Sequence, residues 1–156
     1  MKLYKQTLKS LLVEGMKTPT DLPNGMYVRI IKDPTEQDST VELWAPKPTN
    51  LRRYEGQSTL EMQLGWVGFG RKKLGSDNPC LGASEVFISQ TVTQRFKDIE
   101  VDPDGWGPLM YDIALEVQGE KGLMSDRDEV SAAAGNVWGF YRNNRPDISR
   151  KLLDDR

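Results

Sequence analysis

Gly105-Trp106-Gly107-Pro108 leads into residues 109–118, where Leu109, Ile113 and Val117 recur at helical spacing. The residues before this turn read as a strand, so we expect a strand, a tight glycine turn and a new helix. The backbone N–H groups at such a helix start can hold a phosphate. The stretch therefore predicts a phosphate-bearing ligand such as a cofactor. Two glycines beside a proline also mark ordinary tight connections, so both interpretations stay open.

Working outward, hydrophobic periodicity predicts an amphipathic helix over 2–15 and a later helix over 132–143, capped by Ser131. Alternating and β-branched residues predict strands over 26–32, 40–45, 60–69, 84–93 and 123–124. We expect the first two strands to form a hairpin. Residues 46–58 are expected to form a loop, in which 50–54 has the pattern of one helical turn.

The 60–69 strand alternates, which places one set of side chains on a covered face: Leu60, Met62, Leu64 and Trp66. Gly65, Gly68 and Gly70 indicate a bulge or a close approach by another backbone.

The order of these elements predicts an α+β or mixed α/β fold with a central, mostly antiparallel sheet flanked by helices. A chain of 156 residues with 37% hydrophobic content suits one domain over 1–156. We divide it into an N-terminal helix and strands (1–78), a second half (79–148) and a charged tail (149–156).

Composition excludes several classes of protein. The formal net charge is −2, which gives no general attraction to nucleic acid. Cys80 is the single cysteine and histidine is absent, so zinc sites built on these residues and histidine-based nucleophile systems are excluded. The sequence has no segment of membrane-spanning length and no signal-peptide pattern, which predicts a soluble protein of a reducing compartment.

The sequence also has partial signals for two further ligand classes, calcium and nucleic acid. Glu100, Asp102, Asp104 and Gly105 approach the first half of a calcium loop, but Tyr111 occupies the twelfth position where a glutamate is needed. No metal is therefore expected. A nucleic-acid module would use basic residues beside aromatic ones, and the negative net charge ranks it last. These residues are Arg52, Arg53, Arg71, Lys72 and Lys73, with Tyr54 and Trp66.

A family resemblance rests on several motifs, namely Gly105-Trp106-Gly107-Pro108-Leu109-Met110, Ser131-Ala132-Ala133-Ala134 and Trp138-Gly139-Phe140-Tyr141. Residues 79–148 resemble the acetyl-CoA-binding half of the GNAT acetyltransferase superfamily. They look particularly like short GNAT-like proteins of tailed bacteriophages, which share further motifs. These are Pro79-Cys80, Gly107-Pro108-Leu109-Met110-Tyr111-Asp112, Asp126-Arg127, Val130-Ser131 and Asn144-Arg145-Pro146-Asp147.

The resemblance implies a set of site residues. The coenzyme A pyrophosphate would be cradled by the glycine turn, through Asp104, Gly105, Trp106, Gly107, Pro108 and Leu109. Ser131 would touch the pantetheine arm. Tyr141, or less favourably Tyr111, would protonate the departing thiolate, although Tyr141 also fits a core aromatic at helical spacing. Asp102 departs from the Gln or Arg expected three residues before the first glycine.

The implied activity is transfer of an acetyl group from acetyl-CoA, as co-substrate, to an amine of unknown identity. Glu85, Glu100 or a water would accept the amine proton. The alternative is a catalytically inactive GNAT-fold bacteriophage protein that serves as a virion component or binds a host protein. The expected location is the cytoplasm of a bacterial host cell, or the virion.

Overall fold

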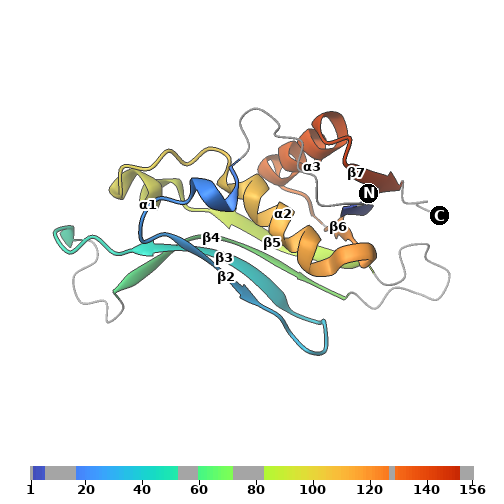
Figure 1. Cartoon of the computed structure of the whole chain (residues 1–156), viewed down its shortest axis with the longest axis horizontal. Helices are drawn as coiled ribbons and strands as arrows, with labels where there is room; N and C mark the ends of the chain where they lie inside the picture. The colour runs from blue at the N-terminus through green and yellow to red at the C-terminus, as the bar shows by residue number, and fades with distance from the viewer. Residues whose placement is uncertain (1, 6–16, 53–59, 72–82, 127–128, 152–156) are drawn as a thin grey trace.

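The computed structural model describes residues 2–5, 17–52, 60–71, 83–126 and 129–151. They form a mixed α+β fold with a seven-stranded sheet in the order β2-β3-β4-β5-β6-β1-β7. The prediction of a mixed α and β protein with a mostly antiparallel sheet is confirmed. The three α-helices lie on one side of β2–β5 (Figure 1). The strands are β1 (Lys2–Lys5), β2 (Tyr27–Ile31), β3 (Ser39–Pro46), β4 (Glu61–Gly70), β5 (Ser84–Thr91), β6 (Leu123–Ser125) and β7 (Ile148–Lys151). The helices are η1 (Pro19–Asp21), α1 (Thr93–Asp98), α2 (Trp106–Gln118), η3 (Gly119–Lys121) and α3 (Ala132–Asn144).

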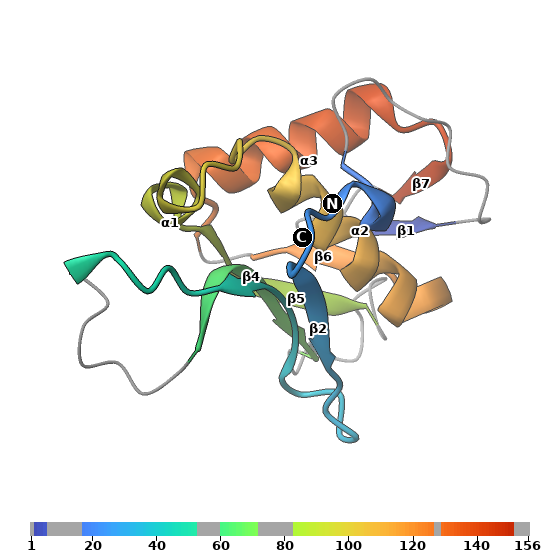
Figure 2. The same ribbon diagram turned by 60° about the vertical axis from the view of Figure 1, so that its left-hand side comes forward.

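The predicted hairpin is confirmed as β2 and β3, which pair antiparallel and continue into β4 and β5. Asp33 organises the turn between β2 and β3, because its carboxylate accepts the backbone N–H groups of Thr35, Gln37 and Asp38. In Figure 2 this meander extends below the helices.

Strand β4 contains the predicted irregularity, and it changes which side chains face the core. Leu43 pairs with Gly65 and Trp44 with Gln63, so Leu64 is an extra residue in β4. Such a bulge reverses the alternation of the faces. Leu64 and Val67 are consequently both buried, whereas Trp66 is half-buried on the other face. The prediction that one alternating set is covered was therefore wrong beyond the bulge, and Leu60 is 83% exposed.

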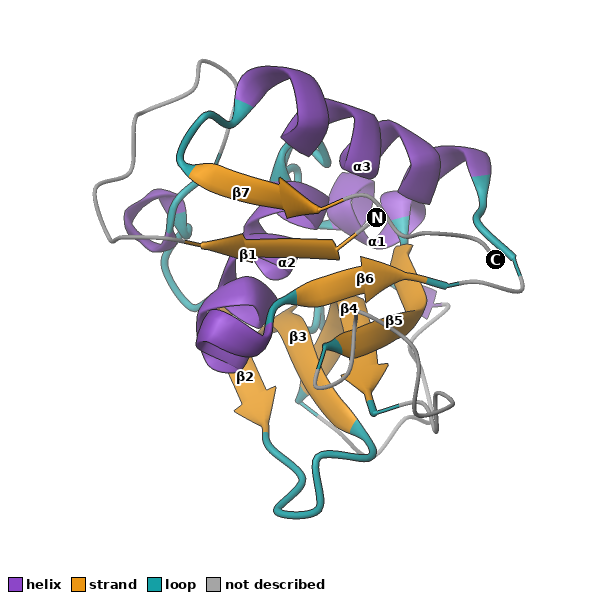
Figure 3. Ribbon diagram, turned by 90° about the vertical axis from the view of Figure 1, so that its right-hand side faces the viewer, coloured by secondary structure: helices purple, strands orange, loops and turns teal. Residues whose placement is uncertain are grey.

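The order of the remaining strands differs from the expectation at both ends of the chain. Residues 2–5 form β1, not the start of a helix, because they pair antiparallel with both β6 and β7. The rest of the predicted helix, 6–16, lies outside the described residues. Ile148–Lys151 pairs along its length with β1, so this part of the expected tail is a strand. Figure 3 shows β7, β1, β6 and β5 side by side.

Helix α2 begins at Trp106, three residues earlier than the predicted start at residue 109. Gly105 precedes it with a φ of 84°, a left-handed conformation that glycine adopts without a steric cost. Pro108 therefore occupies the third helical position, still within the turn whose N–H groups have no intrahelical acceptor. The element before the glycine turn is α1 followed by a loop, not a strand, which corrects the expected strand-turn-helix unit.

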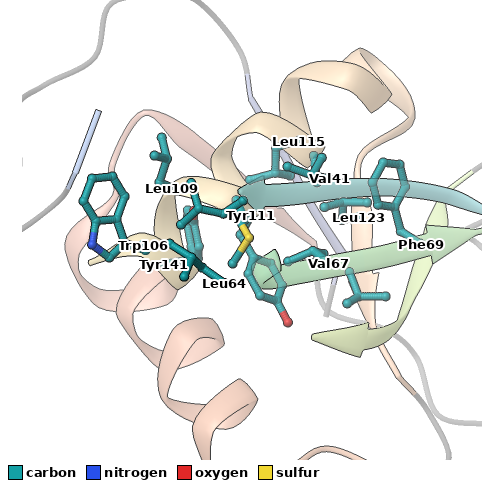
Figure 4. Close-up of a cluster of buried hydrophobic side chains, with 14 of the residues drawn as sticks. Val41, Leu64, Val67, Phe69, Trp106, Leu109, Tyr111, Leu115, Leu123 and Tyr141 are labelled. Atoms are coloured by element: carbon teal, nitrogen blue, oxygen red, sulfur yellow. The ribbon is translucent and has the colours of Figure 1, made fainter. Parts of the chain in front are cut away.

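The core lies between α2 and the sheet. Side chains of β3 and β4 face α2 and meet the aromatic residues at its N-terminal half (Figure 4). The labelled members of this cluster are Val41, Leu64, Val67, Phe69, Trp106, Leu109, Tyr111, Leu115, Leu123 and Tyr141, and all are fully or almost fully buried. In the described part of the chain, no helix is long and apolar enough to cross a membrane.

Candidate functional site

The sheet opens between β5 and β6, two neighbouring strands that run parallel. β5 and β6 pair from Ser84–Leu123 to Val86–Ser125, and within the described residues their pairing ends there. β5 continues to Thr91 along its other partner, β4. The register with β4 shifts at Phe87, where Gly68 pairs with Ile88 and Phe69 with Val86. Because a bulge bends its strand, this extra residue explains why β5 leaves β6 at that point.

Gly68 provides the room for this bulge. A β-carbon at residue 68 would lie 2.6 Å from Ile88 Cγ2 and 2.9 Å from Phe87 Cε2. These two side chains therefore pack directly over the Gly68 backbone, which a larger residue would prevent. Phe87 and Ile88 nevertheless remain 44% and 42% exposed.

A cavity of about 220 Å³ occupies the opening. Its walls come from β5, from α2, from the segment after β6 and from the first half of α3. The lining residues are Val86, Phe87, Ile88, Ser89, Tyr111, Asp126, Glu129, Val130, Ser131, Ala134 and Trp138. Six of these residues are apolar and five carry hydroxyl or carboxylate groups, and the cavity is open to solvent.

Tyr111 and Ser89 form the buried polar part of this cavity. Tyr111 is 2% exposed, and its hydroxyl donates a hydrogen bond to Ser89 Oγ at 3.0 Å. The ring of Trp138 meets the Tyr111 ring edge-on, with centroids 5.7 Å apart. Burial raises the pKa of Tyr111, and the hydrogen bond to Ser89 offsets part of that shift. Tyr111 therefore keeps its proton at neutral pH.

Ser131 also lies in the cavity wall. Its Oγ accepts the backbone N–H of Ala134 at 3.2 Å, which confirms it as the N-cap of α3. The segment just before it contributes Asp126 and Glu129, joined by a hydrogen bond from Glu129 N to Asp126 Oδ1 at 3.3 Å.

The glycine turn lies along α2 from the cavity and does not line it. Gly107 and Tyr111 are four residues apart, a rise of about 6 Å along a helix. Trp106 is 1% exposed, and its indole N–H donates to the Asp102 carbonyl oxygen at 2.8 Å, so this side chain points into the core. A β-carbon on Gly107 would meet nothing within 4 Å. The space above this part of the turn is therefore open.

Asp102 and Asp104 shape the entry to the turn. Asp102 Oδ1 accepts the backbone N–H of Asp104 at 3.0 Å, so that predicted phosphate donor already has an acceptor. Both side chains are exposed. The first turn of α2 contributes N–H groups from Trp106 and Gly107, since Pro108 has none and Leu109 N bonds to the Gly105 carbonyl at 3.3 Å.

Tyr141, the sequence-predicted acid, lies outside the cavity wall. It is 0% exposed, and its hydroxyl lies 2.9 Å from the Pro108 carbonyl oxygen and 3.0 Å from Asp112 Oδ1. Burial, followed by the negative charge of Asp112, raises its pKa well above the ordinary value. Its observed contacts join α3 to α2.

The predicted bases are also away from the cavity. Glu85 is buried in β5, where it pairs with Gly70 on one side and Met124 on the other. Glu100 lies in the loop after α1 with a φ of 56°, and its side chain is exposed. Neither residue lines the cavity.

Sequence reasoning missed most of the cavity wall, including Ser89, Asp126, Glu129 and Trp138 as site residues. The exposed β5 edge depends on where β6 stops pairing, which no local pattern reveals. The glycines of β4 were the available signal, because they marked an irregular neighbour strand. Among the described residues, no group of three or more acidic or cysteine side chains is placed to hold a metal ion.

No known family model, curated protein or solved structure matches this chain.

Proposed function

We propose that this protein is a GNAT-like N-acetyltransferase that moves an acetyl group from acetyl-CoA to an amine. The observation that carries the proposal is the opening between the parallel strands β5 and β6. A cavity lies in this opening, beside the N-terminal half of α2. A thioester in this opening would lie along a strand edge, where backbone N–H groups can polarise its carbonyl.

The residues present suit such a ligand. The open space over Gly107 and the N–H groups of the first turn of α2 would receive the pyrophosphate. Ser131 and the apolar side chains of Phe87 and Val130 would border the acyl-bearing arm. Acetyl-CoA supplies the activated acetyl group, and the protein holds it against the acceptor in an orientation that favours attack.

Asp126 and Glu129 place carboxylates at the wall where an acceptor would enter. A carboxylate attracts an ammonium group and can take its proton, directly or through one water, before the free amine attacks. In the proposed reaction these two residues therefore take the role of proton acceptor that we expected of Glu85 and Glu100.

The experiment is an acetylation assay with three acceptors of different chemistry: spermidine, a lysine-containing peptide and a peptide with a free α-amine. Acetyl-CoA is added, and the acetylated product is identified by mass spectrometry. We expect product with at least one acceptor, and a lower rate for Glu129→Gln. Product formation that is equal with and without the protein, for all three acceptors, would reject the enzyme.

A second candidate function is favoured by Asp102, whose carboxylate stands at the glycine turn where it opposes a pyrophosphate. In this alternative the GNAT-like fold has lost its chemistry, and the protein acts as a phage structural component or binds a host protein. Asp102→Gln distinguishes the two. A wild-type protein that binds no acetyl-CoA, together with a variant that binds it, would favour the inactive fold.

A further inference from the structure

We infer that Ser89 is a catalytic hydrogen-bond donor in the cavity and that Tyr111 positions it. This inference rests on the proposed acetyl transfer and assigns a role that the sequence motifs did not indicate. It is carried by the direction of one hydrogen bond and by the place of the two residues in the cavity wall.

The direction of the bond decides where the Ser89 proton points. Tyr111 Oη donates to Ser89 Oγ at 3.0 Å. A serine hydroxyl has one proton, and because its oxygen is already accepting from Tyr111, that proton is directed elsewhere. Ser89 is half-buried in the wall of the cavity, so its hydroxyl proton can point into the cavity.

The surroundings keep Tyr111 in the donating role. Its ring is held edge-on by Trp138 and tilted against Tyr141, with centroids 5.7 and 6.4 Å away. The phenol is 2% exposed, which favours its neutral form, as the raised pKa also indicates. A fixed, neutral tyrosine donates to Ser89 throughout the physiological pH range, so the orientation of the serine does not depend on pH.

Such a donor is useful where negative charge develops. During acyl transfer the amine nitrogen bonds to the carbonyl carbon, and electrons move onto the carbonyl oxygen. The carbonyl then re-forms as the C–S bond breaks, the sulfur leaves as the thiolate of coenzyme A, and the nitrogen gives its proton to a cavity carboxylate or to water. A hydroxyl held in a fixed orientation stabilises this developing charge more than it stabilises the neutral ground state. Ser89 thus supplements the backbone N–H groups at the free edge of β5, and it transfers no proton.

The test compares Ser89→Ala, Ser89→Thr and Tyr111→Phe with the wild-type protein, using the acceptor found in the acetylation assay. Ser89→Ala should lower kcat by about 100-fold, as expected for loss of one such donor. Ser89→Thr keeps the hydroxyl and should retain most of the activity. Tyr111→Phe should give an intermediate loss. Tyr27→Phe is the matched control, because Tyr27 donates to Glu61 on a different part of the sheet.

Two binding measurements separate this role from a structural one. The affinity for acetyl-CoA should stay within about threefold in Ser89→Ala, because the donor acts mainly on the transition state. In protein with ¹³C-labelled tyrosine, the signal lost in Tyr111→Phe should shift when acetyl-CoA is added to the wild type. Turnover of the wild type with unchanged kcat in Ser89→Ala would overturn this inference alone. Absence of acetyl-CoA binding would overturn the proposed function, and this inference with it.

Discussion

Arg145 Nη1 lies 2.7 Å from Asp112 Oδ1 and joins the end of α3 to the middle of α2. The same guanidinium forms two hydrogen bonds with Asp147, at 2.8 and 2.6 Å. Burial opposes the charge on Arg145, but the hydrogen bonds to Asp147 and Asp112 raise its pKa above the ordinary value. This contact fixes α3 against α2, and α3 forms one wall of the cavity.

Removal of Arg145 should destabilise the protein strongly. Its side chain is 1% exposed, and Arg145→Ala would leave the carboxylates of Asp112 and Asp147 without their shared partner. Loss of one partner from a buried ion pair costs about 3–5 kcal/mol of unfolding free energy. Urea unfolding measures this loss. The control is Arg142→Ala, at an exposed position of the same helix, where we expect a change within about 0.5 kcal/mol. Equal effects of the two variants would contradict the assigned role of Arg145.

Tyr141 should make the stability of the protein sensitive to alkaline pH. Its pKa is higher in the folded protein than in the unfolded chain, mainly through burial. Its contribution to stability is therefore complete below the ordinary tyrosine pKa and is lost as the pH rises above that value. One such proton changes the unfolding free energy by about 1.4 kcal/mol per pH unit.

Unfolding by urea between pH 8 and 11 tests this linkage. We expect Tyr141→Phe to be less stable than the wild type at pH 8, by about 1 kcal/mol, because a buried hydrogen bond is lost. We expect the difference to shrink above pH 10. If the difference in unfolding free energy between the wild type and Tyr141→Phe stays constant up to pH 11, Tyr141 is not the group that makes stability depend on alkaline pH.

Gly70 and Gly107 should respond oppositely to the same change. A β-carbon at residue 70 would lie 1.8 Å from the Gln37 carbonyl oxygen, so the backbone of the β2–β3 turn would have to move. Gly70→Ala should therefore cost about 1–3 kcal/mol, as overpacking does. Gly107→Ala meets no neighbour and replaces a helical glycine, so its effect should be neutral or stabilising by up to about 1 kcal/mol. Thermal unfolding of the two variants measures both, and a stable Gly70→Ala would contradict the close approach at this turn.

Ser131 links stability and the site. Ser131→Ala removes the acceptor for the Ala134 N–H and should lower the unfolding free energy by about 1 kcal/mol. Ser131→Asn keeps a capping side chain and should restore that stability. If the serine also borders the acyl-bearing arm, Ser131→Asn should still weaken acetyl-CoA binding while the fold is fully stable. Calorimetric titration of both variants with acetyl-CoA measures this effect. If Ser131→Asn binds acetyl-CoA as tightly as the wild type, the role of Ser131 is purely structural.

Local patterns predicted the elements whose faces are simple. Strand β3, the helix after Pro108 and the Ser131 cap followed from alternation, helical spacing and capping chemistry. The same rules failed at β1, because Lys2–Lys5 takes its structure from distant partners in β6 and β7. They also misplaced the core face of β4 beyond Leu64, since a bulge in the middle of a strand leaves no periodic signal.

The candidate site was only partly readable for the same reason. Ser131 and the glycine turn are local features, and the sequence identified them. Ser89 and Glu129 become site residues through the end of the β5–β6 pairing, which is set by long-range contacts. Tyr141 and Tyr111 are both aromatic at helical spacing. Only the packing of α3 on α2 decides that Tyr111 lies in the cavity wall and that Tyr141 lies between the two helices.

The proposed function requires that the opening between β5 and β6, together with the start of α2, binds acetyl-CoA. Isothermal titration of the full chain with acetyl-CoA tests it most directly, with Gly107→Glu and Gly107→Ala as a matched pair. We expect a micromolar dissociation constant that Gly107→Ala retains and Gly107→Glu loses, since only the glutamate brings a carboxylate to the proposed pyrophosphate position. Absence of binding by the wild type at millimolar acetyl-CoA would contradict it.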